Sequence, residues 1–192
     1  VDGVDPVIAS VAVLPDSEEL KDVEAATLTE LTEDEMASAT ELTNYLPGTI
    51  PKDYTFKTAS MYKTTMKNGT VYEMLRVHYG NAQSSESPET ILSGEDVVVS
   101  VWSFPPATSK PFYTIDTIPQ RIEGGLFYVQ YGEVYVSFQA DELASEELLS
   151  VVKEIAAVER TGEAGSLEGD YPASIMVNGK LYQMAYITLD EE

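Results

Sequence analysis

The sequence predicts an α+β fold in which a curved antiparallel β-sheet packs on one amphipathic helix toward the C-terminal side. Residues 126–139 alternate apolar with polar or aromatic side chains on both sides of a turn near Gly132, which indicates a β-hairpin. Residues 145–159 repeat apolar side chains at intervals of three and four, which indicates a helix. The segments before them read as consecutive strands without the strand–helix alternation typical of a parallel sheet.

The helix presents a single apolar stripe. Ser145 is its expected N-cap, and Glu146 and Glu147 suit the positive end of the helix dipole. The stripe consists of Leu148, Val151, Val152 and Ile155. One such stripe requires one apolar sheet face to cover.

Residues 1–45 form an acidic lead-in with helical segments. We expect a short strand at 7–13 and a short helix over 17–26. Thr32 lies three residues before Glu35, a spacing that predicts a capping box.

The helix that this box opens is predicted over 33–45, before Pro47-Gly48. Its apolar side is thin, with Met36, Ala39 and Leu42. Two readings stay open, a helix packed at the edge of the sheet and a solvated arm.

The main domain is predicted over residues 46–159. Residues 54–63 and 70–79 are rich in β-branched and aromatic side chains, and Asn68-Gly69 between them predicts a hairpin with a type I′ turn. An exposed polar loop should follow. Residues 97–104 form the most apolar strand, expected at the centre of the sheet, and residues 112–118 lead toward the hairpin.

Residues 160–192 are predicted to be a linker and a C-terminal hairpin. The linker follows from the glycines and acidic residues after Arg160, and the hairpin is centred on Asn178-Gly179 within 173–189. The hairpin could extend the main sheet or stand as a small tail.

The composition excludes several classes of function. The chain has 192 residues, with 33 Asp and Glu against 11 Lys and Arg, for a formal net charge of -22. A phosphate backbone or an anionic membrane would be repelled by such a surface, so neither nucleic acid nor membrane lipid is an expected partner. The chain has no cysteine, which excludes disulfides and thiolate chemistry. Because it begins VDGVDP, we expect that a leader or anchor precedes this point.

Two segments resemble a known family. The first is LPGTIPKDYTFKTASMYK (46–63), and the second is GEVYVSFQADELASEELLSVVKEI (132–155). They resemble the strand entry and the closing strand and helix of an extracytoplasmic domain of unknown function, found in bacterial anti-sigma factors and lipoproteins. The resemblance implies a curved antiparallel sheet wrapped on a helix, similar to lipoprotein-carrier and periplasmic sigma-regulator domains. It also implies a location outside the cytoplasmic membrane, and it supplies no catalytic residues.

No catalytic, cofactor or metal motif stands out in the sequence. His78 is the only histidine, so a metal site would need carboxylates for its other ligands, and a partly exposed strand histidine is the simpler interpretation. No Gly-x-Ser-x-Gly elbow, EF-hand loop or phosphate-binding glycine loop occurs. A carboxylate-dependent hydrolase stays open, because 33 acids bring some pairs close in any fold.

The aromatic residues are the most suggestive feature. There are 12 tyrosines, many of them in predicted strands, and one tryptophan. Cross-strand pairing is the plain explanation, and a concave aromatic face for a ligand is the functional one. The candidate ligand-binding residues are Tyr72, Trp102, Tyr128 and Tyr135.

We therefore expect a non-enzymatic binding or sensing module of a bacterial cell-envelope protein, located outside the cytoplasmic membrane and without a cofactor. Its partner would be a protein or a small apolar, lipid-like or glycan ligand, and any membrane association would depend on an anchor outside this sequence. The alternatives are a structural protein–protein interaction module without a small ligand and a carboxylate hydrolase.

Overall fold

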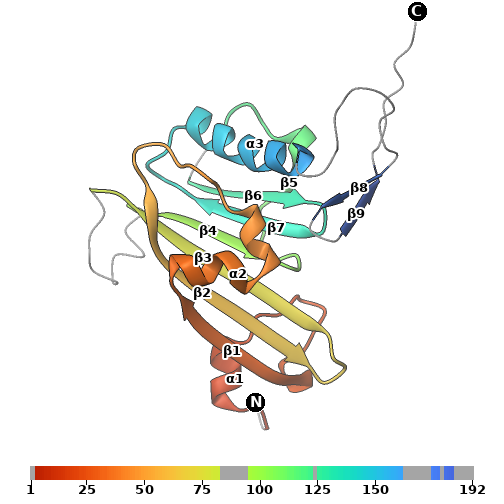
Figure 1. The fold of residues 1–192 in the computed structure, drawn as a ribbon. Coiled ribbons are helices and arrows are strands. Elements are labelled where there is room, and N and C mark those ends of the chain that lie inside the picture. Colours follow the sequence, from red (N-terminus) through yellow and green to blue (C-terminus); the bar gives the residue numbers. More distant parts are fainter. Residues whose placement is uncertain (1–2, 83–94, 123–124, 162–173, 178–179, 184–192) are drawn as a thin grey trace, which may run out of the picture.

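A computed structural model describes residues 3–82, 95–122, 125–161, 174–177 and 180–183 of the chain. Seven strands form one twisted sheet and two more form a separate hairpin (Figure 1). The strands are β1 (Val23–Leu31), β2 (Thr55–Met66), β3 (Val71–Gly80), β4 (Val97–Trp102), β5 (Tyr113–Thr114), β6 (Leu126–Tyr131), β7 (Val134–Gln139), β8 (Ser174–Val177) and β9 (Lys180–Gln183). The helices are α1 (Pro6–Val11), α2 (Glu33–Ala39) and α3 (Ser145–Thr161), with 3-10 turns η1 (Leu20–Asp22), η2 (Glu41–Tyr45) and η4 (Ile115–Thr117).

The sheet has the strand order β1-β2-β3-β4-β7-β6-β5, and its first six strands pair antiparallel. This confirms the predicted α+β class. It also confirms that the valine-rich segment after residue 96 is the central strand, since β4 has three strands on each side. The two-residue β5 differs from the prediction, because it pairs parallel with β6. The connection between them contains η4, which returns the chain to the same end of the sheet.

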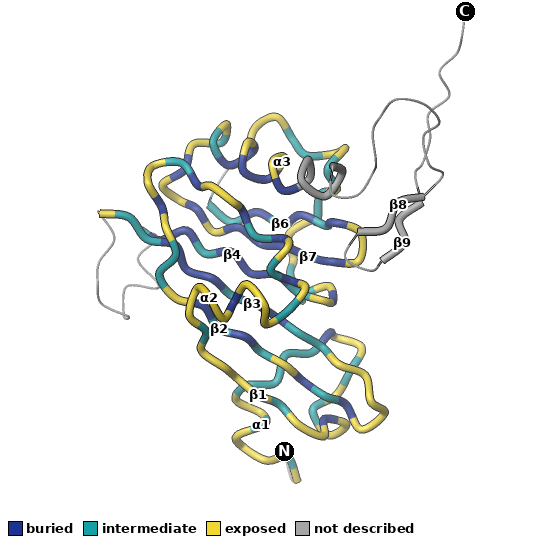
Figure 2. The backbone as a smooth tube through the Cα atoms, in the orientation of Figure 1, coloured by how far each residue is buried: buried dark blue, intermediate teal, exposed yellow. Residues whose placement is uncertain are grey.

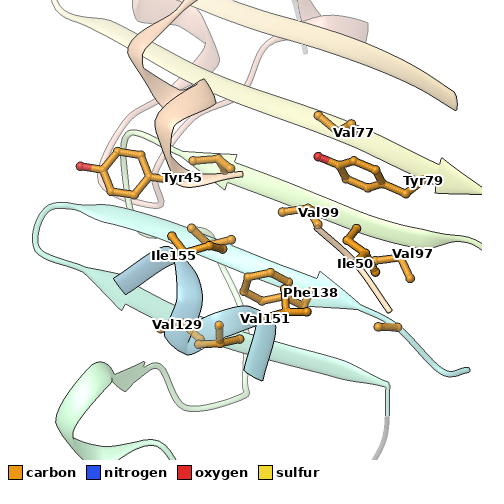
Figure 3. Packing of buried hydrophobic residues seen from close by; sticks show 14 of the residues in the cluster. Tyr45, Ile50, Val77, Tyr79, Val97, Val99, Val129, Phe138, Val151 and Ile155 are labelled. Carbon is orange, nitrogen blue, oxygen red and sulfur yellow. The ribbon is translucent and has the colours of Figure 1, made fainter. Parts of the chain in front are cut away.

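One face of the sheet carries the main hydrophobic core, and we call it the covered face. Helices α2 and α3 and turn η2 pack on it (Figures 1 and 2). In Figure 3, Val151 and Ile155 of α3 lie against Phe138 and Val129 of the sheet. The prediction that the apolar stripe of this helix packs on the sheet is therefore confirmed. The core residues with no exposed surface are Leu75, Val77, Val99, Val101, Val129, Val136, Phe138 and Val152.

The alternate residues of each strand form the second face, which is partly covered by the N-terminal segment. The backbone N–H of Val13 donates to Thr64 Oγ1 at 2.8 Å, and the Tyr72 hydroxyl donates to Glu18 at 2.9 Å. Beneath this segment Met66 and Met74 are buried, outside the main core. The second face thus has its own small core at the β1–β3 end.

The N-terminal predictions were partly wrong. The segment expected as a strand at 7–13 instead forms α1, which Asp5 caps by accepting from the N–H of Val7 at 2.9 Å. The helix expected over 17–26 is replaced by η1 and the start of β1. Edge strand β1 is mostly exposed, so its sequence has no clear two-residue period, and its backbone pairing with β2 decides its conformation. The domain boundaries at residues 45 and 160 stay predictions.

The capping box of Thr32 and Glu35 is confirmed, and α2 begins directly after it. The helix predicted over 33–45 is present as α2 followed by η2. Met36 and Leu42 belong to the main core, so this segment packs at the edge of the sheet and is not a solvated arm.

The β2–β3 hairpin is present, but its turn differs from type I′. Gly69 has a φ of 88°, whereas Asn68 is not among the residues with positive φ. The N–H of Gly69 donates to the carbonyl of Met66 at 2.9 Å, and the N–H of Met66 to Thr70 at 2.8 Å. This is the three-residue loop with a glycine bulge. In the β6–β7 hairpin, Gly132 with a φ of 64° takes the first central position of a two-residue turn, as predicted from Gly132.

Helix α3 begins one residue earlier than predicted, at the residue expected to be its N-cap. Ser145 is its first residue, and the Ser145 hydroxyl donates to the carbonyl of Ile122 at 2.6 Å. Glu147 accepts instead from the N–H of Ala144 at 2.8 Å. Ser145 therefore ties the helix start to the loop before β6 and does not cap the helix.

The C-terminal hairpin is present as β8 and β9, which form a two-stranded sheet of their own. Its predicted turn at Asn178-Gly179 lies outside the described residues, as do most of the polar loop predicted over 81–96 and most of the linker predicted over 161–170. No helix in the described ranges is long and apolar enough to cross a membrane.

Candidate ligand-binding face

All four candidate residues lie on the second face of the sheet, and each is half-buried. Trp102 on β4 stands directly opposite Tyr135 on β7, and Tyr128 on β6 stands opposite Ser137, the next residue of β7 on this face. Three of the four candidates are therefore neighbours on adjacent strands. Their two-residue alternation with core residues puts them on the face that α3 does not cover.

Phe112 completes this group from outside the sheet. Its ring meets the rings of Tyr128 and Tyr135 edge to face, with centroids 5.3 Å and 5.2 Å away. This geometry favours ring contact because the positive ring edge meets a negative ring face. We call Trp102, Phe112, Tyr128 and Tyr135 the aromatic patch.

Tyr72 lies on the same face but apart from the aromatic patch. Its ring packs edge to face on Phe104 at 5.4 Å, and its hydroxyl is bound to Glu18. Partial burial raises the pKa of the Tyr72 hydroxyl, and the hydrogen bond to Glu18 raises it further. Tyr72 therefore holds the N-terminal segment in place, and its predicted place in the ligand site has no support from this geometry.

A polar row runs beside the aromatic patch. Ser60, Arg76, Ser100 and Ser137 are successive partners across four strands, and Tyr128 follows. The Arg76 Nε donates to the Ser100 hydroxyl at 3.2 Å, which holds the guanidinium along the sheet. The second face thus offers rings and hydrogen-bonding groups side by side.

His78 is the least satisfied polar group of the second face. The side chain is 7% exposed, and its Nδ1 is buried without a hydrogen-bond partner. Burial lowers the pKa of His78, with Asp96 acting in the opposite direction and Arg76 and Lys57 adding to the decrease. The prediction that His78 is partly exposed was therefore wrong.

Asp96 is the only buried carboxylate among the described residues, and it accepts from Lys57 Nζ at 2.9 Å. A hydrolase with two facing acids needs a second carboxylate across a cleft. Here the partner of the buried acid is an ammonium group. Within the described ranges, no group of three or more His, Asp or Glu side chains could hold a metal ion.

Three pockets are described, each of about 320–340 Å³. One lies on the covered face between α2 and the sheet and is lined by Tyr54, Phe56 and Tyr79 together with Glu33. Another lies beside η2 and contains Glu41 and Glu73. The third adjoins the aromatic patch, because Tyr128 lines it together with Lys110 and Arg121.

Sequence reasoning found the strand aromatics but not Phe112, Lys110 or Arg121. These three residues belong to the connection between β4 and β6, which has several prolines and no periodicity. The sequence feature that could have identified this site is the occurrence of Lys110 and Arg121 near aromatic residues in a strongly acidic chain.

Comparison with protein-family models, curated proteins and solved structures found no match for this chain.

Proposed function

We propose that this protein is a non-enzymatic binding module of a bacterial cell-envelope protein, and that it holds a sugar-like ligand on the aromatic patch. The supporting observation is the contiguity of the patch: half-buried rings from β4, β6 and β7, with Phe112 against two of them, lie together on the face away from α3. The extracytoplasmic location is carried by the resemblance of residues 46–63 and 132–155.

The chemistry of the patch suits a ring with both apolar and polar edges. Tyrosine and tryptophan combine an apolar face with a hydroxyl or N–H at the tip. The Tyr135 hydroxyl accepts from the Gln130 amide at 3.3 Å, so its position is fixed before a ligand arrives. Fixed rings lose little rotamer entropy on binding, which favours affinity.

A protein partner is the second candidate. Tyr, Trp and Arg are the residues that most often dominate protein interfaces, and Arg76 lies beside the patch. Of the patch residues only Tyr128 lines one of the described pockets, so most of the surface is shallow. A shallow surface of this composition also suits a macromolecule.

The test uses Trp102, the only tryptophan of the chain, as a fluorescent reporter inside the patch. Soluble neutral oligosaccharides are titrated while Trp102 emission is recorded, and calorimetry gives the affinity. Saturable change in emission is expected. Tyr135→Ala should weaken binding by about five- to 150-fold, since stacking contacts of this kind contribute about 1–3 kcal/mol.

The matched control is Phe56→Ala, which removes a half-buried ring on the covered face. It should leave affinity unchanged once its fold is verified by thermal unfolding. If native mass spectrometry of protein from its own host shows a bound protein and no sugar produces a change, the patch is a protein interface and the sugar proposal is wrong.

A further inference from the structure

The pocket beside the aromatic patch combines features that no other described pocket has. It lies between the connection over residues 110–122 and strand β6, with a volume of about 320 Å³. Volumes near this value are at the lower end for small-ligand sites. Among the described residues, its wall contains two cations, Lys110 and Arg121, and no acidic side chain, whereas the two other described pockets each contain glutamate.

The two cations lack carboxylate partners within the described part of the chain. Lys110 Nζ has a long contact of 3.4 Å to the carbonyl of Leu126, and Arg121 makes no ion pair there. By contrast, Lys21, Lys52 and Lys57 each pair with a carboxylate. In a chain with 33 acids and 11 basic residues, a pocket that brings together two cations with no carboxylate partner among the described residues is a local concentration of positive charge.

The aromatic wall of the pocket is rigid. Tyr113 stacks on Phe127 with centroids 5.3 Å apart and planes 18° from parallel. Tyr128 belongs both to this wall and to the aromatic patch. A ligand with a ring on the patch can therefore place an adjoining group in the pocket.

We propose that this pocket is an anion subsite, and that the ligand of the aromatic patch is an acidic sugar bearing a carboxylate or phosphate group. The inference rests on the proposed function and specifies its ligand class. The planar guanidinium of Arg121 can donate two parallel hydrogen bonds to such a group, and the ammonium of Lys110 adds a point charge. The acidic remainder of the surface slows the approach of anions in general, so recognition depends on this local site.

The test compares tetragalacturonate with its fully methyl-esterified form, which keeps the sugar rings and removes the charges. The acid form is expected to bind at least tenfold more tightly at about 20 mM NaCl, with the advantage decreasing at about 300 mM as salt screens the charges. Inorganic phosphate is added as a competitor. Displacement by phosphate at low millimolar concentration identifies phosphate as the preferred group, and its failure identifies carboxylate.

The variants are Arg121→Ala and Lys110→Ala, both at exposed positions, with Lys153→Ala on the exposed side of α3 as the matched control. Each pocket variant keeps one of the two cations and should lose most of the preference for the acid form, and the control should behave as wild type. Equal binding of both forms by the wild type, with the Tyr135 effect intact, overturns the anion subsite while the proposed function stands. If the wild type binds neither form, the anion subsite is overturned, and the proposed function falls with it only if no neutral oligosaccharide changes Trp102 emission either.

Discussion

His78 is a buried residue whose surroundings disfavour its charged form. Its charged neighbours are Asp96 and Glu30, which favour the imidazolium, and Arg76 and Lys57, which oppose it. Burial is the largest influence and lowers the pKa, so His78 is neutral in the folded chain under conditions where an exposed histidine is partly charged. The sequence could not reveal the burial of His78. The residue alternates onto the second face, where coverage by the N-terminal segment and loops decides which side chains are exposed to solvent.

The lowered pKa predicts a pH-dependent stability difference between wild type and His78→Gln. Below its ordinary pKa of about 6.5 the unfolded chain binds a proton at His78 that the folded chain does not, so wild-type stability falls as pH decreases. The free energy of unfolding, measured with urea from about pH 8 to about pH 5.5, should decrease more in the wild type than in the variant. Parallel pH profiles would contradict the predicted pKa decrease.

At the level of elements, the two-residue sequence period located the strands that bury one face in the core, and it missed the strand that is mostly exposed. Strands β2, β3, β4, β6 and β7 each have one face in the main core, and their residues alternate accordingly. Strand β1 is exposed along most of its length, and its Ala and Glu content favours helix locally. Only its hydrogen bonds to β2 make it a strand, and those depend on the fold as a whole.

The aromatic patch likewise contains residues that the strand period could predict and one that it could not. Trp102, Tyr128 and Tyr135 could be selected because each follows a strand alternation, although their adjacency depends on a register that no single strand reveals. Phe112 lies in a connection with several prolines, where no sequence period indicates which face of the sheet a residue will contact. The cations of the neighbouring pocket belong to the same connection and were unpredictable for the same reason.

Backbone conformation at the turns gives a prediction with a control inside the chain. Gly69 has a φ of 88° and open space where a Cβ would stand, so Gly69→Ala adds backbone strain without a collision. It should lower the free energy of unfolding by about 1 kcal/mol. Gly48 has the same open space without a positive φ, and Gly48→Ala should leave stability unchanged or raise it by up to about 1 kcal/mol.

Chemical denaturation of the two variants beside the wild type provides the measurement. A further variant, Asp53→Gly, relieves backbone strain instead of adding it, because Asp53 has a φ of 60° and its neighbour Lys52 a φ of 62°. Relief of this left-handed strain should offset the flexibility that glycine adds to the unfolded chain. Equal losses in Gly69→Ala and Gly48→Ala would show that φ is not the cause.

At the scale of the whole molecule, the sheet separates two roles. The covered face buries the main core under α2, η2 and α3, and stability resides mainly there. The second face is covered at its β1–β3 end by the N-terminal segment and presents the aromatic patch toward β6. A binding surface on the side opposite the principal helix can change its residues with little effect on the core.

The net charge of -22 predicts that salt stabilises the fold. Repulsion among the acids is present in the compact state and weaker in the extended one, whereas fully exposed ion pairs such as Lys21–Glu19 add little to stability. Screening therefore removes more repulsion than attraction. The midpoint of thermal unfolding should rise as NaCl increases from about 10 mM to about 300 mM, where the Debye length falls below the spacing of most surface charges. Sucrose at matched osmolality is the control for general exclusion effects. A midpoint that falls with NaCl would mean that ion pairs such as Lys57–Asp96 outweigh the repulsion among the acids.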